Sequence, residues 1–251
     1  MTSNIKIACI IPSRLGSTRL PNKALLPING VPMVARVMQQ AKKCALFNKV
    51  LVATDSSKIA DTVLEYGGEA IMTDPELATG TDRVASVAAQ LEGFQVIVNL
   101  QGDEPFMQPS MLEALVSPYL NGENPEMSTL AHTLKPEDHA RPEVVKVITD
   151  RSGYALYFSR SPIPYLRTDN RTLEQLPVYH HMGIYAFRAD FLQHFTRLAM
   201  GDLELAESLE QLRALENGFK IKVQLVKTST LEINTPQDYE LAKNFKPEMD
   251  I

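Results

Sequence analysis

Three cations lie close together near the start of the chain, at Arg14, Arg19 and Lys23. They follow an unbroken apolar run, Ile7 to Ile11, which predicts a strand buried on both faces. In an open α/β sheet, ligands bind at loops that leave the carboxyl ends of such strands. Guanidinium and ammonium groups favour a polyphosphate, helped here by the hydroxyls of Ser13 and Ser17. A solvated basic loop explains the charge equally well.

Asp103 is a second candidate, in the segment QGDEP that follows a strand-like apolar stretch from Phe94 to Leu100. That strand would bring Asp103 to the same sheet edge as the cationic loop. Mg²⁺ is commonly held by one or two carboxylates together with phosphate oxygens. Gly-Asp after a strand is also common turn chemistry, but an acid beside three cations favours the metal hypothesis.

The segment TGTDR, Thr79 to Arg83, predicts a helix that is entered through Gly80. The free N–H groups at a helix N-terminus can receive a ribose or a phosphate. Taken alone, the segment is better explained as an ordinary helix cap, with Thr79 or Thr81 as the cap residue and Asp82 opposite the helix dipole.

Two aromatic segments later in the chain, YALYFSR and HHMGIYAFR, are strand-like, and their rings are expected in the core. Arg160 ends the first segment and His181 lies near the start of the second. Arg binds a carboxylate through two hydrogen bonds and His can bond a hydroxyl, although either residue alone is more often structural. Glu210 and Gln211 lie on a predicted helix whose periodicity does not decide between a ligand and water.

Strands and helices alternate in the first half of the chain, which predicts a mostly parallel sheet with helices on both faces. Pro12 and Gly16 are expected to end the first strand, because neither continues a regular ladder comfortably. The remaining elements are predicted as helices over 31–45, 58–66 and 79–91, and as strands over 49–54, 69–72 and 94–100.

Strands predominate after about Leu120, and a loop rich in Pro and Arg is expected over 161–177. A helix over 203–217 is predicted as one continuous element ended by Gly218. The last helix should begin at Thr235, because Pro236 and Asp238 complete an N-terminal capping pattern. No repeat or flexible linker is found, so we expect a single domain, 1–251, with halves at 1–120 and 121–251. The other strands are expected at 127–134, 144–149, 154–159, 181–187 and 220–227, and another helix at 190–198.

The composition is that of an ordinary globular protein of 251 residues. Its net charge of −5 argues against nucleic-acid binding, so the basic loop is a local feature. No apolar run approaches membrane-spanning length and no signal peptide is evident, so no membrane partner is expected. Cys9 and Cys44 lack metal-ligand spacing and are interpreted as reduced core residues. We therefore expect a cytoplasmic location.

The chain resembles the 3-deoxy-manno-octulosonate cytidylyltransferase (CMP-Kdo synthetase) family from about Ile5 to Leu241. That family transfers CMP from CTP to an acidic eight-carbon sugar, Kdo, for lipopolysaccharide biosynthesis and releases pyrophosphate. The resemblance implies a three-layer α/β/α nucleotidyltransferase fold with a Rossmann-like central sheet, and a smaller β-rich lobe that carries the sugar site and the dimer contacts. It also implies a homodimer and Mg²⁺. The segments that carry it are PSRLGSTRLPNKAL, VLVATD, TGTDR, VIVNLQGDEP, YALYFSR, HHMGIYAFR, LEQLRALENG and NTPQDYE.

The resemblance also implies roles for individual residues. Arg14, Lys23 and Asp103 would be catalytic, with Asp103 and Asn234 at the metal. The nucleotide would be bound by Ser13, Ser17, Arg19, Thr79, Gly80, Arg83 and Gln101. The sugar would be bound by Gln101, Arg160, His181, Tyr185, Glu210 and Gln211.

The chain departs from the family's pattern in three places, one of which, Asp202-Leu203-Glu204 in place of a usual Pro-Leu-Glu, is interpreted as a loop change. Leu77 stands where a His is expected before TGTDR, which puts a contact on the nucleoside side in doubt. Asn234 stands where the family has an Asp that binds Mg²⁺. An amide oxygen is neutral, so we expect a weaker or retuned metal site. The same change could instead mark an enzyme that acts on a modified sugar such as 8-amino-Kdo.

Three other classes of protein remain to be compared with this interpretation. A metal-dependent glycosyltransferase would share the α/β half and the strand-end Asp, but would not need the cationic loop. A non-catalytic nucleotide-sugar binding protein would bind CTP without releasing pyrophosphate, and the Asn at 234 gives this alternative some weight. An NAD-dependent oxidoreductase is disfavoured because the chain lacks the GxGxxG fingerprint.

Overall fold

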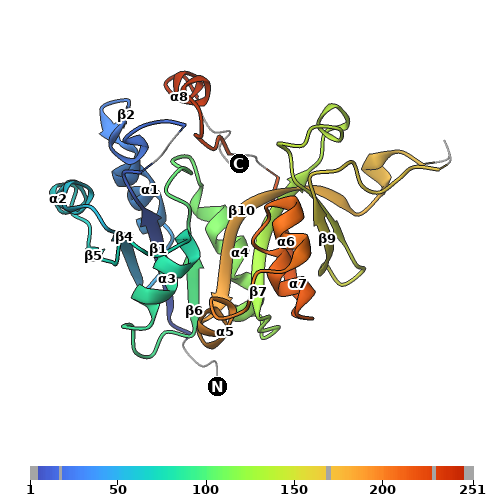
Figure 1. Ribbon diagram of the computed structural model, residues 1–251, viewed down its shortest axis with the longest axis horizontal. Helices are drawn as coiled ribbons and strands as arrows, with labels where there is room; N and C mark the ends of the chain where they lie inside the picture. The colour runs from blue at the N-terminus through green and yellow to red at the C-terminus, as the bar shows by residue number, and fades with distance from the viewer. Residues whose placement is uncertain (1–4, 17–18, 168–170, 228–229, 246–251) are drawn as a thin grey trace.

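The structure is a computed structural model, and it describes residues 5–16, 19–167, 171–227 and 230–245. Within these residues a sheet of nine strands contains the path β11-β7-β10-β6-β1-β4-β5 (Figure 1). The two other strands branch from this path, because β8 pairs with β10 and β9 pairs with β8. Parallel pairing joins β1 to β4 and β6, β4 to β5, and β11 to β7, whereas β10 is antiparallel to its neighbours. The main strands are β1 (Ile7–Ser13), β4 (Lys49–Thr54), β5 (Ala70–Met72), β6 (Val96–Asn99), β7 (Met127–Thr133), β10 (Val178–Arg188) and β11 (Ile221–Leu225).

Helices cover both faces of this sheet, as the alternation of strands and helices predicts. Alternate side chains of β1 point to opposite faces, so Cys9 lies in one core cluster and Ile10 in the other. On the Cys9 face lie α1 (Met33–Lys42), α2 (Ser57–Glu65) and α4 (Pro109–Leu120). On the Ile10 face lie α3 (Gly80–Ala88), α5 (Ala189–Phe195) and α7 (Leu212–Glu216). The three-layer α/β/α fold is therefore confirmed. The helix α4 was not predicted from the sequence.

The first strand is buried along its whole length, as its apolar run predicts, but the expectation that Pro12 ends it is wrong. The backbone carbonyl of Ile10 accepts a hydrogen bond from the backbone N–H of Leu100, so the backbone of Ile10 faces the β6 side. Backbone direction repeats every two residues in a strand, so the backbone of Pro12 faces the same side. The paired register of β6 stops at Asn99, opposite Ile10. The missing N–H of Pro12 therefore faces a side with no strand partner, and pairing with β4 continues to Ser13.

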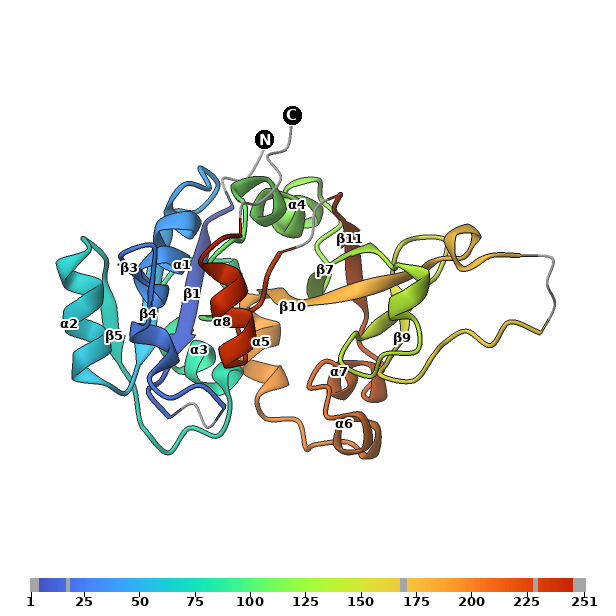
Figure 2. The same ribbon diagram turned by 90° about the horizontal axis from the view of Figure 1, so that it is seen from above.

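The second half adds the β-rich lobe that was expected. The long strand β10 pairs with β7 along most of its length, with β6 near its end and with β8 (Lys146–Thr149) near its start. The strand β9 (Ala155–Ser159) pairs with β8 and extends the lobe away from β1, β4 and β5 (Figure 2). Both views show the single curved strand β10 crossing from one half to the other.

The last helix returns to the first half of the chain. α8 (Pro236–Ala242) begins at Thr235, whose side chain forms the predicted capping box with Asp238. The Tyr239 hydroxyl donates to the carbonyl of Pro27, 2.7 Å away, in the hairpin β2 (Pro27–Ile28) and β3 (Val31–Pro32). Figure 2 shows α8 beside the part of the molecule that contains β1. None of the described helices is both long enough and apolar enough to cross a membrane.

Candidate active site

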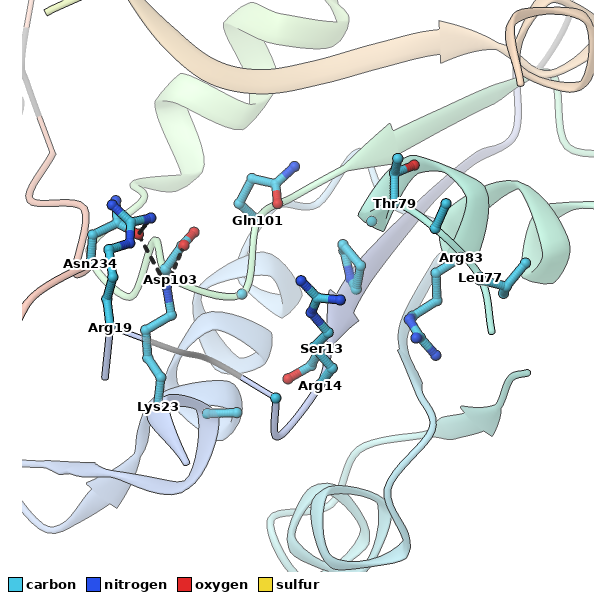
Figure 3. Close-up of a pocket in the computed structure, with 16 residues that line it drawn as sticks. Ser13, Arg14, Arg19, Lys23, Leu77, Thr79, Arg83, Gln101, Asp103 and Asn234 are labelled. Atoms are coloured by element: carbon cyan, nitrogen blue, oxygen red, sulfur yellow. Dashed lines mark hydrogen bonds and ion pairs between the residues drawn. The ribbon is translucent and has the colours of Figure 1, made fainter. Parts of the chain in front are cut away.

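A cavity of about 350 Å³ lies where the chain leaves the carboxyl ends of β1 and β6. These strands are neighbours, but the chain continues from β1 to the β4 side of the sheet, so they mark the point where the strand order reverses. Ligands bind at such points in open α/β sheets. All the described residues predicted for the nucleotide and the metal line this cavity: Ser13, Arg14, Arg19, Lys23, Thr79, Gly80, Arg83, Gln101, Asp103 and Asn234 (Figure 3). Ser17 lies outside the described residues.

Lys23 joins three segments that are far apart in the sequence. Its Nζ lies 2.6 Å from Oδ2 of Asp103 and 3.2 Å from Oδ1 of Asn234. Arg19 also donates to Oδ1 of Asn234, at 3.2 Å. The side chains of Lys23 and Asp103 are 17% and 18% exposed, so water screens this pair only partly. The prediction that the cationic loop lies beside Asp103 is therefore confirmed.

The oxygens around Lys23 Nζ suit a magnesium ion. Oδ2 of Asp103 and Oδ1 of Asn234 approach the same ammonium, so both can face one cation. Mg²⁺ prefers such oxygen ligands and usually adds phosphate oxygens and water. Among the described residues no group of three His, Cys, Asp or Glu side chains forms a ready-made metal site. The donors present fit a magnesium that is shared with a nucleotide, and not a site enclosed by protein alone.

The segment that carries Asn234 is pinned to the loop after β6. Ile233 N donates to the Asp103 carbonyl at 3.0 Å, and the Thr230 hydroxyl donates to Glu104 at 2.6 Å. Burial raises the pKa of Glu104 to about 8, and the Thr230 hydrogen bond opposes this rise. The amide of Asn234 also donates to Oε1 of Glu232 at 2.5 Å. Glu104, Thr230 and Glu232 could not be predicted from the sequence, because their roles depend on a contact between distant segments.

Gly102 allows the loops after β1 and β6 to come close together. A Cβ atom at Gly102 would lie 3.0 Å from the carbonyl oxygen of Pro12. Backbone atoms cannot move away as a flexible side chain can. The glycine of QGDEP therefore brings Asp103 within reach of the cationic loop, a role that the sequence analysis did not assign.

The start of α3 forms the opposite wall of the cavity. Thr79 caps the helix and forms a capping box with Asp82, as the simpler interpretation of TGTDR predicts. The N-terminus of α3 nevertheless opens on the cavity, since Thr79 and Gly80 both line it. Figure 3 shows Thr79, Leu77 and Arg83 on one side and Lys23, Asp103 and Asn234 on the other, with Gln101 and Arg14 between them.

Arg83 lines the same cavity, but its guanidinium group is already paired. It donates to Asp55 at 2.9 Å and to the hydroxyl of Thr73. Its side chain is only 3% exposed. This arrangement ties α3 to the loop after β4 and supports the wall of the cavity.

A second cavity of about 360 Å³ lies on the other side of Thr79, Gly80 and Gln101, which line both cavities. Its remaining wall comes mainly from α6 (Asp202–Glu207), the turn that follows it and the start of α7. Of the residues predicted for the sugar, Gln101 and Glu210 line this cavity.

The continuous helix predicted over 203–217 is wrong, because α6 and α7 are separate helices. Ser208 takes up a left-handed conformation with φ 52° between them. Arg213 donates to both carboxylate oxygens of Glu204, at 2.7 and 2.6 Å, and this buried pair folds the two helices together. Glu216 accepts hydrogen bonds from the backbone N–H groups of Leu203 and Glu204. Apolar periodicity continues through the break, which is why the sequence did not reveal it.

The break turns Glu210 and Gln211 toward the protein interior. Glu210 accepts a hydrogen bond of 2.5 Å from the Thr81 hydroxyl, and Gln211 accepts one of 3.0 Å from the Tyr185 hydroxyl. The other polar atoms of this pair, Glu210 Oε1 and Gln211 Nε2, are buried and have no hydrogen-bond partner among the described residues. Buried polar groups normally have partners, so these two atoms leave one acceptor and one donor for a bound ligand or a water molecule.

His181 and Tyr185 lie deeper, on β10. The rings of these residues have centroids 5.6 Å apart, and His181 also meets the ring of Phe158. The His181 ring lies 2.9 Å from the Thr129 hydroxyl. Burial lowers the pKa of His181 to about 3, and raises the pKa of Tyr185 well above its ordinary value. Both side chains are therefore neutral near pH 7.

Arg160 directly follows β9 and lines neither of these two cavities. Its Nε donates to the Glu207 carbonyl at 2.8 Å and its Nη1 to the Pro142 carbonyl at 3.1 Å. The buried ammonium of Lys146 donates to the carbonyl of Arg160 at 2.6 Å. The structure thus fixes Arg160 beside the end of α6. It does not bring all six predicted sugar residues to one described cavity.

Comparison with known proteins identifies the family. The cytidylyltransferase family model matches residues 8–222. A 3-deoxy-manno-octulosonate cytidylyltransferase of Acaryochloris marina is 50% identical over 242 residues, 96% of this chain and 97% of the relative. The chain belongs to the 3-deoxy-manno-octulosonate cytidylyltransferase family. The cytidylyltransferase of Synechococcus elongatus is 46% identical over 95% of this chain and 97% of its own length.

A solved structure agrees with this cytidylyltransferase assignment. It is a CMP:2-keto-3-deoxy-manno-octonic acid synthetase in complex with CTP, 39% identical, with a TM-score of 0.89 over 95% of this chain and 97% of that chain. The family inferred from the motifs is therefore confirmed. A glycosyltransferase or an NAD-dependent oxidoreductase is no longer supported.

Proposed function

We propose that this cytidylyltransferase transfers CMP from CTP to Kdo and releases pyrophosphate. The observation that carries the proposal is the meeting of Lys23 with Asp103 and Asn234 in a cavity that Arg14 and Arg19 also line. Cations and metal-binding oxygens on one wall suit a nucleoside triphosphate, and the relatives named above supply the substrate class.

The reaction needs alignment more than covalent chemistry from the protein. The anomeric hydroxyl oxygen of the sugar forms a bond to the α-phosphorus of CTP, the bond to the bridging oxygen of the β-phosphate breaks, and the hydroxyl proton leaves to solvent. Arg14, Arg19 and Lys23, with Ser13 and Ser17, would hold the triphosphate as charge moves onto the departing pyrophosphate. Thr79, Gly80 and Arg83 would form the wall of the cavity beside the nucleoside.

Asp103 and Asn234 would hold Mg²⁺. When bound, the ion would neutralise charge on phosphate oxygens. Because Asn234 contributes a neutral oxygen, Asp103 would be the only charged ligand of the two. Leu77 lines the cavity, and its apolar side chain cannot replace a hydrogen bond from His.

The sugar would lie on the far side of Gln101, toward the cavity that Glu210 lines. The unpartnered Glu210 Oε1 and Gln211 Nε2 offer an acceptor and a donor for its hydroxyls. Arg160, His181 and Tyr185 complete the predicted sugar set, with Arg160 assigned to the sugar carboxylate. These roles stay predictions.

The broader setting is also part of the proposal. We propose a cytoplasmic homodimer acting in lipopolysaccharide biosynthesis. The cysteines Cys9 and Cys44 are free and buried, which suits a reducing compartment. The division into a nucleotide-binding half, 1–120, and a sugar-binding and dimerisation half, 121–251, needs one amendment, because Asn234 from the second half lines the nucleotide cavity.

The direct test is pyrophosphate release by the purified protein with CTP, Mg²⁺ and Kdo, run beside 8-amino-Kdo and a sialic acid. Release with Kdo as the preferred sugar is the expected result. Preference for the amino sugar would keep the reaction and change the substrate. CTP binding without release with any sugar, at millimolar Mg²⁺ or Mn²⁺, would overturn the proposal in favour of a binding protein.

A further inference from the structure

A line of hydrogen-bonded polar side chains, buried in its middle, runs along the wall that the two cavities share. Gln101 Nε2 donates to Asn99 Oδ1 at 3.4 Å, and Asn99 Nδ2 donates to the Thr81 hydroxyl at 3.2 Å. That hydroxyl donates in turn to Glu210 Oε2 at 2.5 Å. The line therefore begins at a residue common to both cavities and ends at the carboxylate of the second.

The middle of this line is almost closed to water, although Thr81 also lines the second cavity. Asn99 is fully buried and Thr81 is 2% exposed. A buried polar group without a partner is costly, so each member restricts the position of the next. Thr81 is the only member of the line that touches Glu210, and its hydroxyl both accepts and donates. A methyl group in its place could do neither.

The sheet fixes the geometry of the line. Asn99 on β6 is the register partner of Tyr185 on β10, so their side chains lie next to each other on one face. Tyr185 donates to Gln211, and Asn99 reaches Glu210 through Thr81. Paired positions on two neighbouring strands, Asn99 and Tyr185, therefore hold the consecutive residues Glu210 and Gln211 in the turn between α6 and α7.

We propose that Thr81 and Asn99 are positioning residues, which orient Glu210 so that its unpartnered Oε1 meets the sugar. The inference rests on the proposed function, because it assumes that Glu210 faces Kdo. Thr81 follows Thr79 and Gly80 in the helix that lines the nucleotide cavity. One helix would thus position both the wall of the nucleotide cavity and the Glu210 carboxylate that contacts the sugar. Loss of the Thr81 hydroxyl should impair use of the sugar while leaving CTP binding intact.

The test compares Thr81→Val with Thr81→Ser, which keeps the hydroxyl, and with Thr62→Val. Thr62 is the matched control because it is also a helical threonine, with its hydroxyl bonded to the Lys58 carbonyl on α2. For Thr81→Val we expect the KM for Kdo to rise about tenfold, the effect of one hydrogen bond to a charged group. The KM for CTP should stay within about twofold, and the other two variants should resemble the wild type.

A double-mutant cycle separates positioning from general stability. If Thr81 acts through Glu210, Thr81→Val should add little to the KM defect of Glu210→Gln. Additive effects, an unchanged KM for Kdo, or equal rises in both KM values would overturn the inference while the wild-type turnover still supports the proposed function. Absence of turnover in the wild type would overturn both. If Thr81→Val does not fold, Thr81→Ala allows the same comparison.

Discussion

The ammonium of Lys23 lies 2.6 Å from the carboxylate of Asp103, and this pair joins the loop after β1 to the loop after β6. The same ammonium is 3.2 Å from the side-chain oxygen of Asn234, which comes from the segment before α8. Three separate segments therefore present a cation, a carboxylate and an amide oxygen to one point. In a phosphoryl-transfer site, such a point is where cations and metal-binding oxygens must be held without rearrangement.

Replacing Asp103 should remove most of the activity. Asp103→Asn leaves two neutral amides facing the metal, so we expect kcat/KM to fall by a factor of about 10²–10³. Lys23→Met should have an effect of similar size through loss of the cation. Steady-state pyrophosphate release measures both. Lys49→Met, which breaks the more exposed pair with Glu69, is the control and should leave activity unchanged.

Restoring a carboxylate at position 234 should strengthen metal binding. Asn234→Asp adds a negative charge beside Asp103, so the Mg²⁺ concentration for half-maximal activity should fall several-fold. Titration with Mn²⁺, followed by its electron paramagnetic resonance signal in the presence of CTP, provides a measurement independent of turnover. An unchanged metal requirement in both experiments would show that Asn234 does not contact the metal.

Acid should destabilise the protein partly through His181. Its pKa is lowered to about 3, first by burial and then by His180, whereas an unfolded histidine titrates near its ordinary value of 6.5. Between these values the unfolded chain binds more protons, so the free energy of unfolding should fall as pH drops below about 6.5. The maximum slope from one such group is about 1.4 kcal/mol per pH unit.

Urea unfolding of His181→Gln between pH 4 and 7 measures this contribution. The variant should show a smaller dependence on pH than the wild type. The exposed His194 provides the control substitution, His194→Gln, which should keep the wild-type dependence. An identical slope in the wild type and His181→Gln would mean that His181 does not drive the acid sensitivity.

The buried pair of Glu204 and Arg213 should dominate the stability of the turn between α6 and α7. Arg213→Met leaves the carboxylate of Glu204 buried without its partner, so we expect a loss of about 3 kcal/mol in the free energy of unfolding. Adding Glu204→Leu should recover much of that loss, because no charge is then left buried. Equilibrium unfolding in urea tests both variants. A double variant no more stable than Arg213→Met would contradict this explanation.

Local signals in the sequence were enough to predict the layered fold and one side of the site. The buried run at Ile7 to Ile11 gave β1, and the capping pattern at Thr235 gave the start of α8. Because parallel strands end at the same sheet edge, the loop after β1 and Asp103 had to meet. Lys23 and Asp103 confirm that inference directly.

The features that were missed depend on contacts between distant segments. Nothing near Ser208 marks a helix break, since the break is held by Arg213, Glu204 and Glu216 after the chain has folded back. Pro12 remains in its strand only because β6 stops beside it. No local pattern contains the position of a neighbouring strand, so hydrophobic periodicity alone could not reveal either feature.

The position of Asn234 has a consequence for the order of events during synthesis. Lys23 and Asn234 are 211 residues apart, and the last strand of the sheet ends at Leu225. Every strand of the sheet can therefore leave the ribosome before the segment that completes the cation site. A chain that ended at Leu225 would contain every strand of the sheet and both Lys23 and Asp103, but would lack the second oxygen ligand, Asn234. Competence to hold the metal is acquired only with the final stretch of the chain.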